Sequence, residues 1–173
     1  HRRGFLGPGQ AAQADHTHPL RPDVKIFLGA EGPKNVALTA EIADGWLPLY
    51  YSPFRPEVYA ESLSGMKPGF EIAAGVSVQI TDDVSQGLAP VKAMLGFYIG
   101  GMGAKKRNFH MELMGRMGFE AEAQVIQDLY LDGKRKEAVA AVPDAMVDAF
   151  NLIGTPDEIK DRFQVWKESG ADH

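Results

Sequence analysis

The strongest constraint on the fold is an apolar run, VKIFLGA at residues 24–30, that leads through glycine into a helix start. Its β-branched and aromatic members, bounded by Pro22 and Gly32, are typical of a short strand buried on both faces. Pro33 stands where a first helical residue belongs, and Gly32 precedes it as an N-cap. The unit therefore predicts a strand, a tight turn and a helix that ends at Gly45.

The same alternation of strand and helix continues along the chain. We expect strands at residues 46–51 and 71–80, a short helix at 56–63, a helix that starts at Asp82 or Asp83, and mostly helix from 107 to 149. Thr155-Pro156-Asp157-Glu158 is a capping box that opens a last helix. Strands this apolar, alternating with helices, indicate an α/β fold with a parallel sheet. A doubly wound sheet and a barrel both fit this pattern.

Composition excludes several classes of protein. The 173 residues are 45% hydrophobic and 24% charged, which is typical of a globular domain. No apolar run is long enough for a membrane span and no signal peptide is recognisable, so we expect a cytoplasmic protein without a membrane partner. Cysteine is absent, which excludes disulfides and thiolate chemistry. The net charge of −5 argues against a nucleic-acid partner, although residues 105–107 are basic.

The ends of the sequence suggest a piece of a longer protein. The chain starts at His1 without a methionine, and it stops just after a helix C-cap at Ser169-Gly170. Residues 1–17, rich in glycine, glutamine and histidine, are expected to form an irregular lead-in. We expect such a piece to be inactive by itself.

The turn at residues 29–34 has the chemistry of an anion site. Backbone N–H groups at a helix start lack partners and carry partial positive charge, so a phosphate fits there. Gly29 and Gly32 leave the backbone open to a ligand, and Lys34 is unfavourable beside the helix dipole unless an anion lies in front of it. The alternative is an ordinary turn in which Lys34 is solvated and Glu31 repels phosphate.

Other candidate sites are less specific. Tyr50 and Tyr51, with Phe54, follow the second expected strand and would wall a planar ligand, because ligands collect at the carboxyl ends of parallel strands; the alternative is that they are core aromatics. His16 and His18 are a single i, i+2 pair in a loop, which is too few ligands for a metal ion, so no metal site is expected.

Four segments together resemble a known family. They are HPLRPDVKIFLGAEGPKNVALTAEIADGWLPLYYSP (18–53), YIGGMGAKKRNFH (98–110), IQDLYLDGK (126–134) and LIGTPDEIKDRF (152–163). The chain resembles the bacterial luciferase-like monooxygenase family, and within it the actinobacterial subfamily of oxidoreductases that use the deazaflavin coenzyme F420. The resemblance covers about nine-tenths of the chain, from residue 18 onward.

The resemblance implies a fold and a set of binding positions. The fold would be a partial (β/α)8 TIM barrel, roughly its C-terminal half with a helical insertion, and residues 1–173 would belong to one domain. Family members bind the coenzyme phosphate at the turn after the strand at 26–30. The matching cofactor-binding positions are Gly29, Ala30, Glu31, Gly32, Pro33 and Lys34. The family's catalytic residues lie on earlier strands, so none is assigned here.

The expected function is therefore hydride transfer between reduced deazaflavin and a small organic substrate, which Tyr50 and Tyr51 would help to enclose. One alternative is a monooxygenase of the same fold that uses flavin mononucleotide (FMN), since both coenzymes carry phosphate. A second alternative is a non-catalytic barrel that binds a flavin-like ligand. Family members are often homodimers, which is the assembly expected for the full-length protein.

Overall fold

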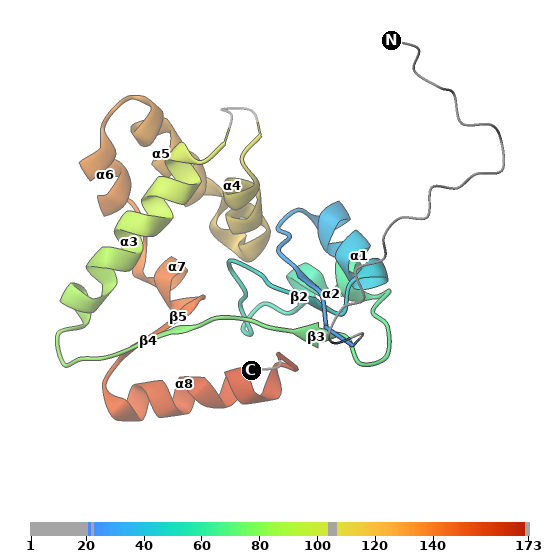
Figure 1. Ribbon diagram of the computed structural model, residues 1–173. Coiled ribbons are helices and arrows are strands. Elements are labelled where there is room, and N and C mark those ends of the chain that lie inside the picture. Colours follow the sequence, from blue (N-terminus) through green and yellow to red (C-terminus); the bar gives the residue numbers. More distant parts are fainter. Residues whose placement is uncertain (1–20, 22, 104–106, 172–173) are drawn as a thin grey trace, which may run out of the picture.

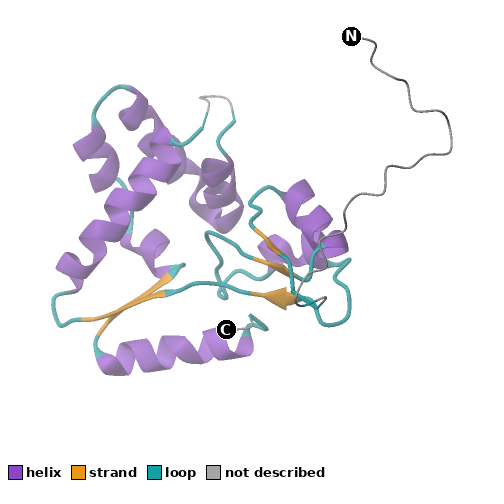
Figure 2. Cartoon of the chain, viewed as in Figure 1, coloured by secondary structure: helices purple, strands orange, loops and turns teal. Residues whose placement is uncertain are grey.

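The computed structural model describes residue 21 and residues 23–103 and 107–171, and it is an α/β structure with parallel strands (Figures 1 and 2). The first part of the chain alternates strands and helices. Its elements are β1 (Phe27–Leu28), α1 (Pro33–Ile42), β2 (Gly45–Trp46), α2 (Glu57–Leu63), β3 (Glu71–Ile72) and β4 (Ser77–Ile80). The second part is mainly helical. Its elements are α3 (Val84–Gly101), α4 (Phe109–Met114), η1 (Gly115–Phe119), α5 (Glu120–Leu131), α6 (Arg135–Ala140), α7 (Asp144–Asp148), β5 (Asn151–Gly154) and α8 (Pro156–Glu168).

The described strands form two short parallel sheets. β1, β2 and β3 pair in that order, with Phe27 opposite Gly45 and Trp46 opposite Ile72. β4 pairs with β5, with Ser77 opposite Asn151. One extended run through β3 and β4 joins the two sheets, and α8 lies along it (Figure 1). The long third strand expected at residues 71–80 is thus two strands with different partners.

The helices begin largely where the sequence predicts. Asp83 caps α3 by accepting the amide of Gln86 at 3.2 Å, and Thr155 caps α8. The helical stretch after residue 107 is divided at Gly118, whose φ of 91° only glycine adopts readily, and at Gly133. The glycines at 100 and 101 are the last residues of α3.

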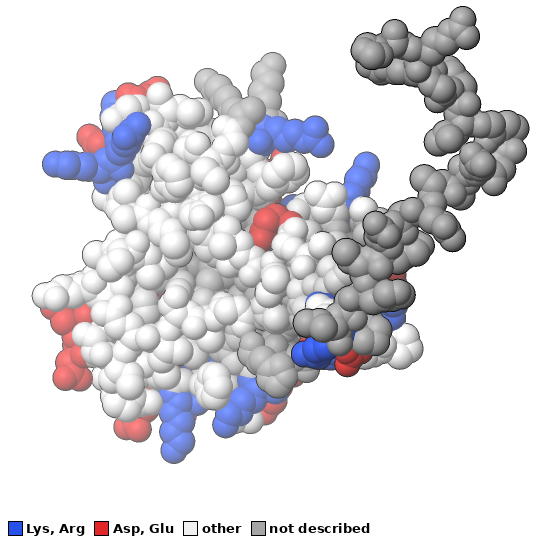
Figure 3. All heavy atoms as spheres, viewed as in Figure 1, with Lys and Arg blue, Asp and Glu red and all other residues white. Residues whose placement is uncertain are grey.

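The strands are shorter and less covered than expected. Val24 and Ile26 are each 60% exposed, so the first half of the run at residues 24–30 is not a buried strand. Val78 and Ile80, in β4, are 55% and 67% exposed, and β4 pairs with β5 alone among the described residues. The face of the molecule drawn in Figure 3 is mainly uncharged, with most of its charged side chains toward the margins.

The prediction that Gly45 ends the first helix was wrong, and β5 was missed. Gly45 does not end α1, which ends at Ile42 with Ala43 as its C-cap. Gly45 lies in β2, where a Cβ would come within 2.2 Å of the Phe27 ring and 2.8 Å of the Glu71 carbonyl oxygen. β5 was not predicted, because four residues without alternation carry too little local signal.

Candidate functional site

The start of α1 is open on its N-terminal side. Gly32 is the N-cap in an extended conformation, with φ −79° and ψ 143°, and no side chain caps the helix. The amides of Asn35 and Val36 both donate to the Gly32 carbonyl, at 2.9 and 3.0 Å. Pro33 has no N–H, and the amides of Gly32 and Lys34 have no acceptor among the described residues. Two N–H groups are therefore available to an anion at the positive end of the helix.

Hydrogen bonds from Trp46, in β2, and from the following Leu47 hold this turn in place. The indole Nε1 of Trp46 donates to the carbonyl oxygen of Ala30 at 2.8 Å, and the amide of Leu47 donates to the carbonyl of Leu28 at 3.0 Å. Trp46 is only 1% exposed, and Tyr51 and Tyr59 pack edge-on against its ring. A buried and hydrogen-bonded indole is a rigid support for the backbone that precedes α1.

The carboxylate of Glu31 is hydrogen-bonded to the segment after β2. Its Oε1 accepts the amide of Leu49 at 2.7 Å, so the side chain ties the turn to the segment after β2. Burial raises the pKa of Glu31, although the bond from Leu49 and the nearby Arg116 guanidinium oppose this rise. Arg116, from η1, also approaches the Glu31 carbonyl with Nη2 at 3.5 Å. The acid that argued against an anion is therefore already hydrogen-bonded to the chain.

A cleft of about 440 Å³ lies against the turn. Its lining residues are Gly29, Ala30, Glu31, Gly32, Asn35, Leu47, Pro48, Leu49 and Phe109. Four of the six predicted positions line it, whereas Pro33 and Lys34 do not, and Lys34 lies exposed on α1. Phe109, from α4, was not predicted; its ring passes within 3.5 Å of where a Cβ at Gly32 would be.

The residues at this cleft fit a phosphate ester. The ten-residue helix α1 begins beside the cleft at Gly32, the amides of Gly32 and Lys34 have no acceptor among the described residues, no acid is present in the first turn, and Arg116 is near. The glycines keep the backbone open to the ligand. This arrangement can bind and position an anion, and no described group in it forms an acid–base pair with a nucleophile.

Tyr50 and Tyr51 are both buried, at 5% and 4% exposure, and they face different clusters. Tyr51 stacks on Tyr59, with ring centroids 5.3 Å apart, and its hydroxyl donates to the Ser169 carbonyl at 3.3 Å. Tyr50 packs against Tyr98, His110 and Phe150. Neither tyrosine lines the cleft beside Gly32.

Phe54 lies in a separate cavity of about 400 Å³. Phe119, Ala145 and Ala149 supply apolar walls, and Arg162 places its guanidinium 5.9 Å from the Phe54 ring centroid. That guanidinium is held by Asp148, which accepts from it at 3.1 Å. The charge in this cavity is thus already paired.

The remaining sequence candidates bear less on the site. His16 and His18, and Lys105 and Lys106, lie outside the described residues. Within the described ranges, no three His, Asp or Glu side chains gather as metal ligands would. None of the described helices is long and apolar enough to cross a membrane.

Comparison with known proteins finds relatives whose names refer to the same coenzyme. A protein of Mycobacterium tuberculosis named "Putative coenzyme F420-dependent oxidoreductase Rv3520c" is 43% identical over 177 residues, which cover 97% of this chain and 51% of that protein. The structure resembles the coenzyme F420-dependent tetrahydromethanopterin reductase of Methanopyrus kandleri, with a TM-score of 0.64, 23% identity and coverage of 86% of this chain and 43% of that one. It also resembles an F420-dependent secondary alcohol dehydrogenase solved with an F420–acetone adduct, with a TM-score of 0.56, 16% identity, and coverage of 87% and 42%.

The chain spans about half the length of these relatives. At such low identity the two structural matches establish a shared fold, which agrees with the parallel strands and covering helices described above. The sequence model of the family described as "Luciferase-like monooxygenase" matches residues 6–173. From this match over nearly the whole sequence, together with the fold, we conclude that the chain belongs to the luciferase-like monooxygenase family.

Proposed function

We propose that the protein is a coenzyme F420-dependent oxidoreductase that binds the coenzyme phosphate at the start of α1. The observation that carries the proposal is the uncapped start of α1, where the amides of Gly32 and Lys34 have no acceptor among the described residues and Gly32 lines a cleft. The three similar proteins described above carry coenzyme F420 in their names, which supports this coenzyme over FMN.

Each residue of the site has a defined task in this proposal. The amides at Gly32 and Lys34 donate to phosphate oxygens, and Arg116, whose Nη2 lies 3.5 Å from the Glu31 carbonyl oxygen, supplies a positive charge near the turn. Glu31 and Trp46 position the turn through Leu49 and Ala30. When bound, the deazaflavin supplies the hydride chemistry, while the chain binds it and orients it. No catalytic residue is assigned within residues 1–173.

The proposal extends to the architecture and the assembly. The parallel strands, with helices between them, would form part of a single (β/α)8 barrel domain whose carboxyl strand ends carry the site. The substrate would be a small organic molecule enclosed partly by Tyr50 and Tyr51, and the complete enzyme would be a cytoplasmic homodimer. These features rest on the family resemblance, together with the fold similarity.

Titration of the purified protein with coenzyme F420 and, separately, with FMN tests the proposal. We expect F420 to bind with a dissociation constant at least tenfold below that of FMN, a difference of about 1.4 kcal/mol. Inorganic phosphate should compete with F420, because it occupies the same amides. Tighter binding of FMN would favour the monooxygenase alternative, and binding of neither coenzyme would contradict the proposal.

A further inference from the structure

Phe109 forms an apolar wall of the cleft beside the start of α1. It is the first residue of α4, it lines the cleft, and its ring lies 3.5 Å from where a Cβ at Gly32 would be. Phe109 is 43% exposed, so a ligand in the cleft can reach its side chain. Leu47 and Leu49 also line the cleft and are also exposed. Exposed apolar side chains beside an anion site favour a ligand whose charged group is attached to an organic part.

Asn108 joins the start of α4 to the end of α3. Its side chain is buried, and both ends of its amide group are hydrogen-bonded. Oδ1 accepts the amides of His110 and Met111, at 3.0 and 3.1 Å, and thereby caps α4. Nδ2 donates to the carbonyl oxygens of Ile99 and Tyr98, at 2.6 and 3.2 Å. These two carbonyls belong to the last turn of α3, where carbonyl groups lack partners within the helix.

The end of α3 is a rigid support for Asn108. α3 packs against α5, and a Cβ at Gly100 would come within 2.4 Å of the Cβ of Tyr130, in α5 (Figure 1). Ile99, which accepts the shorter of the two bonds, is fully buried. A buried amide whose donors and acceptor are all paired has a defined orientation. Asn108 therefore fixes where α4 begins, and with it the place of the next residue, Phe109.

We infer that Phe109 packs against the organic part of the coenzyme next to its phosphate, and that Asn108 is the positioning residue that holds Phe109 there. A side chain that is held in place before binding loses little freedom when the ligand arrives, so holding it strengthens binding. The amides of α1 bind the phosphate, whereas Phe109 contacts the part of the ligand that is attached to it. This inference rests on the proposed function.

Phe109→Ala tests the contact with the coenzyme. The dissociation constants for coenzyme F420 and for phenyl phosphate, measured by calorimetry, should each rise roughly tenfold. The dissociation constant for inorganic phosphate should stay unchanged, because phosphate has no organic part. Unchanged F420 affinity would mean that Phe109 does not contact the coenzyme, and an equal loss of phosphate affinity would mean that the ring only supports the anion site. Either result overturns the inference.

Asn108→Ser tests the positioning role, because serine still caps α4 but is too short to reach the carbonyls of α3. F420 affinity should fall roughly threefold. In a Phe109→Ala background the same change should leave F420 affinity unaltered, although it still lowers the unfolding temperature. If Asn108→Ser weakens F420 binding equally in both backgrounds, or in neither, Asn108 does not act through Phe109 and the inference is overturned.

Asn151→Ser is the matched control. Asn151 is also buried, and its Nδ2 donates to a helix carbonyl, that of Val147, at 2.9 Å, but neither neighbour of Asn151 in the chain lines the cleft. The variant should lower the unfolding temperature without changing F420 affinity. A loss of affinity equal to that in Asn108→Ser would overturn the inference. Absence of F420 binding by the unmodified protein overturns the proposed function itself, so the two failures are distinguishable.

Discussion

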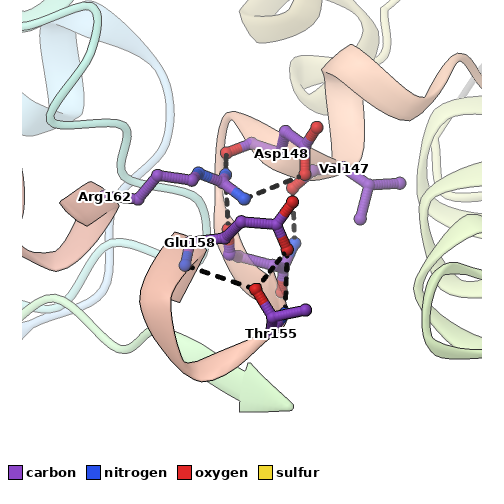
Figure 4. Close-up of polar contacts among 6 residues, drawn as sticks. Val147, Asp148, Thr155, Glu158 and Arg162 are labelled. Carbon is purple, nitrogen blue, oxygen red and sulfur yellow. Dashed lines mark hydrogen bonds and ion pairs between the residues drawn. The ribbon is translucent and has the colours of Figure 1, made fainter. Parts of the chain in front are cut away.

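Two helices of this protein begin with similar sequences, but the first amides of one are capped by side chains and those of the other are not. α1 and α8 each follow a strand, each has proline as its first residue, and each has an extended N-cap, Gly32 or Thr155. At α8 the Thr155 hydroxyl accepts the amide of Glu158 at 3.4 Å, and Glu158 Oε2 accepts the amide of Thr155 at 2.8 Å (Figure 4). At α1 no side chain does this.

The difference lies in where each glutamate points. Glu158 caps its own helix, and the bonds from the Thr155 amide and hydroxyl lower its pKa. Glu31 reaches away to Leu49, and burial raises its pKa. Near α8, the carbonyl oxygens of Asp148 and Asn151 also have a hydrogen-bond partner, because both accept from Arg162 (Figure 4). A self-capped helix start serves stability alone, whereas an uncapped start beside a cleft is available to a ligand.

Gly32→Asp should abolish this difference and has the largest expected effect. The new carboxylate would cap α1 and occupy the space of the phosphate, so F420 affinity should fall by about 2–3 kcal/mol, or roughly 30- to 150-fold. Stability without ligand should rise by about 0.5–1 kcal/mol in urea unfolding. The site has room, because a Cβ at Gly32 would meet only the Phe109 ring, at 3.5 Å.

Gly32→Asn is the control for charge, because asparagine caps equally well without a negative group. It should stabilise the protein and weaken F420 binding less than aspartate does. Unchanged F420 affinity in Gly32→Asp would mean that the amides of α1 are not the anion site.

Thr155→Ala should destabilise the start of α8. Loss of the cap is expected to lower the free energy of unfolding by about 1–2 kcal/mol without altering F420 affinity. Chemical unfolding and ligand titration of the same sample measure both quantities. A comparable loss of F420 binding would contradict the division between a structural and a ligand-binding helix start.

Lys34→Glu should weaken F420 binding moderately, by about 1 kcal/mol, because the charge at the helix start is reversed beside a bound anion. The effect is smaller than that of Gly32→Asp because Lys34 does not line the cleft. Lys160→Glu, an exposed change on α8, is the matched control and should leave affinity unchanged. Equal effects in both variants would indicate only general electrostatic attraction.

Glu31→Gln has the smallest expected effect and tests the sign of its pKa shift. A carboxyl whose folded pKa is raised above 4.5 destabilises the folded state when ionised, so the neutral amide should be neutral or stabilising at pH 7, by less than about 1 kcal/mol. The gain should vanish below pH 4.5, where Glu31 is protonated in both states. A marked loss of stability at pH 7 would show that the ionised carboxylate is needed for the bond to Leu49.

The helices of this fold were predictable because their signals are local. Asp83, Pro33 and the box at Thr155 each act within one helical turn, and each marks the start of a helix in the structure. Strands depend on partners far along the chain. β3 and β4 are separate because one pairs with β2 and the other with β5, which residues 71–80 alone do not reveal.

The candidate site likewise has a part that was predictable from local sequence and a part that was not. The glycine turn was recognisable, since its geometry depends on consecutive residues. Arg116 approaches Glu31 from 85 positions away, and Phe109 comes from the helical region, so neither follows from the pattern around the turn. For Phe109 and His110, the segment at 98–110 that resembles the family was the one available signal.

The hydrogen bond between Trp46 and Ala30 makes the protein its own optical probe. The sequence contains two tryptophans, Trp46 and Trp166. In a Trp166→Phe background, all indole emission would arise from a ring whose N–H touches the backbone just ahead of α1. Any rearrangement of that backbone would then change the colour and lifetime of the emission, without a dye attached.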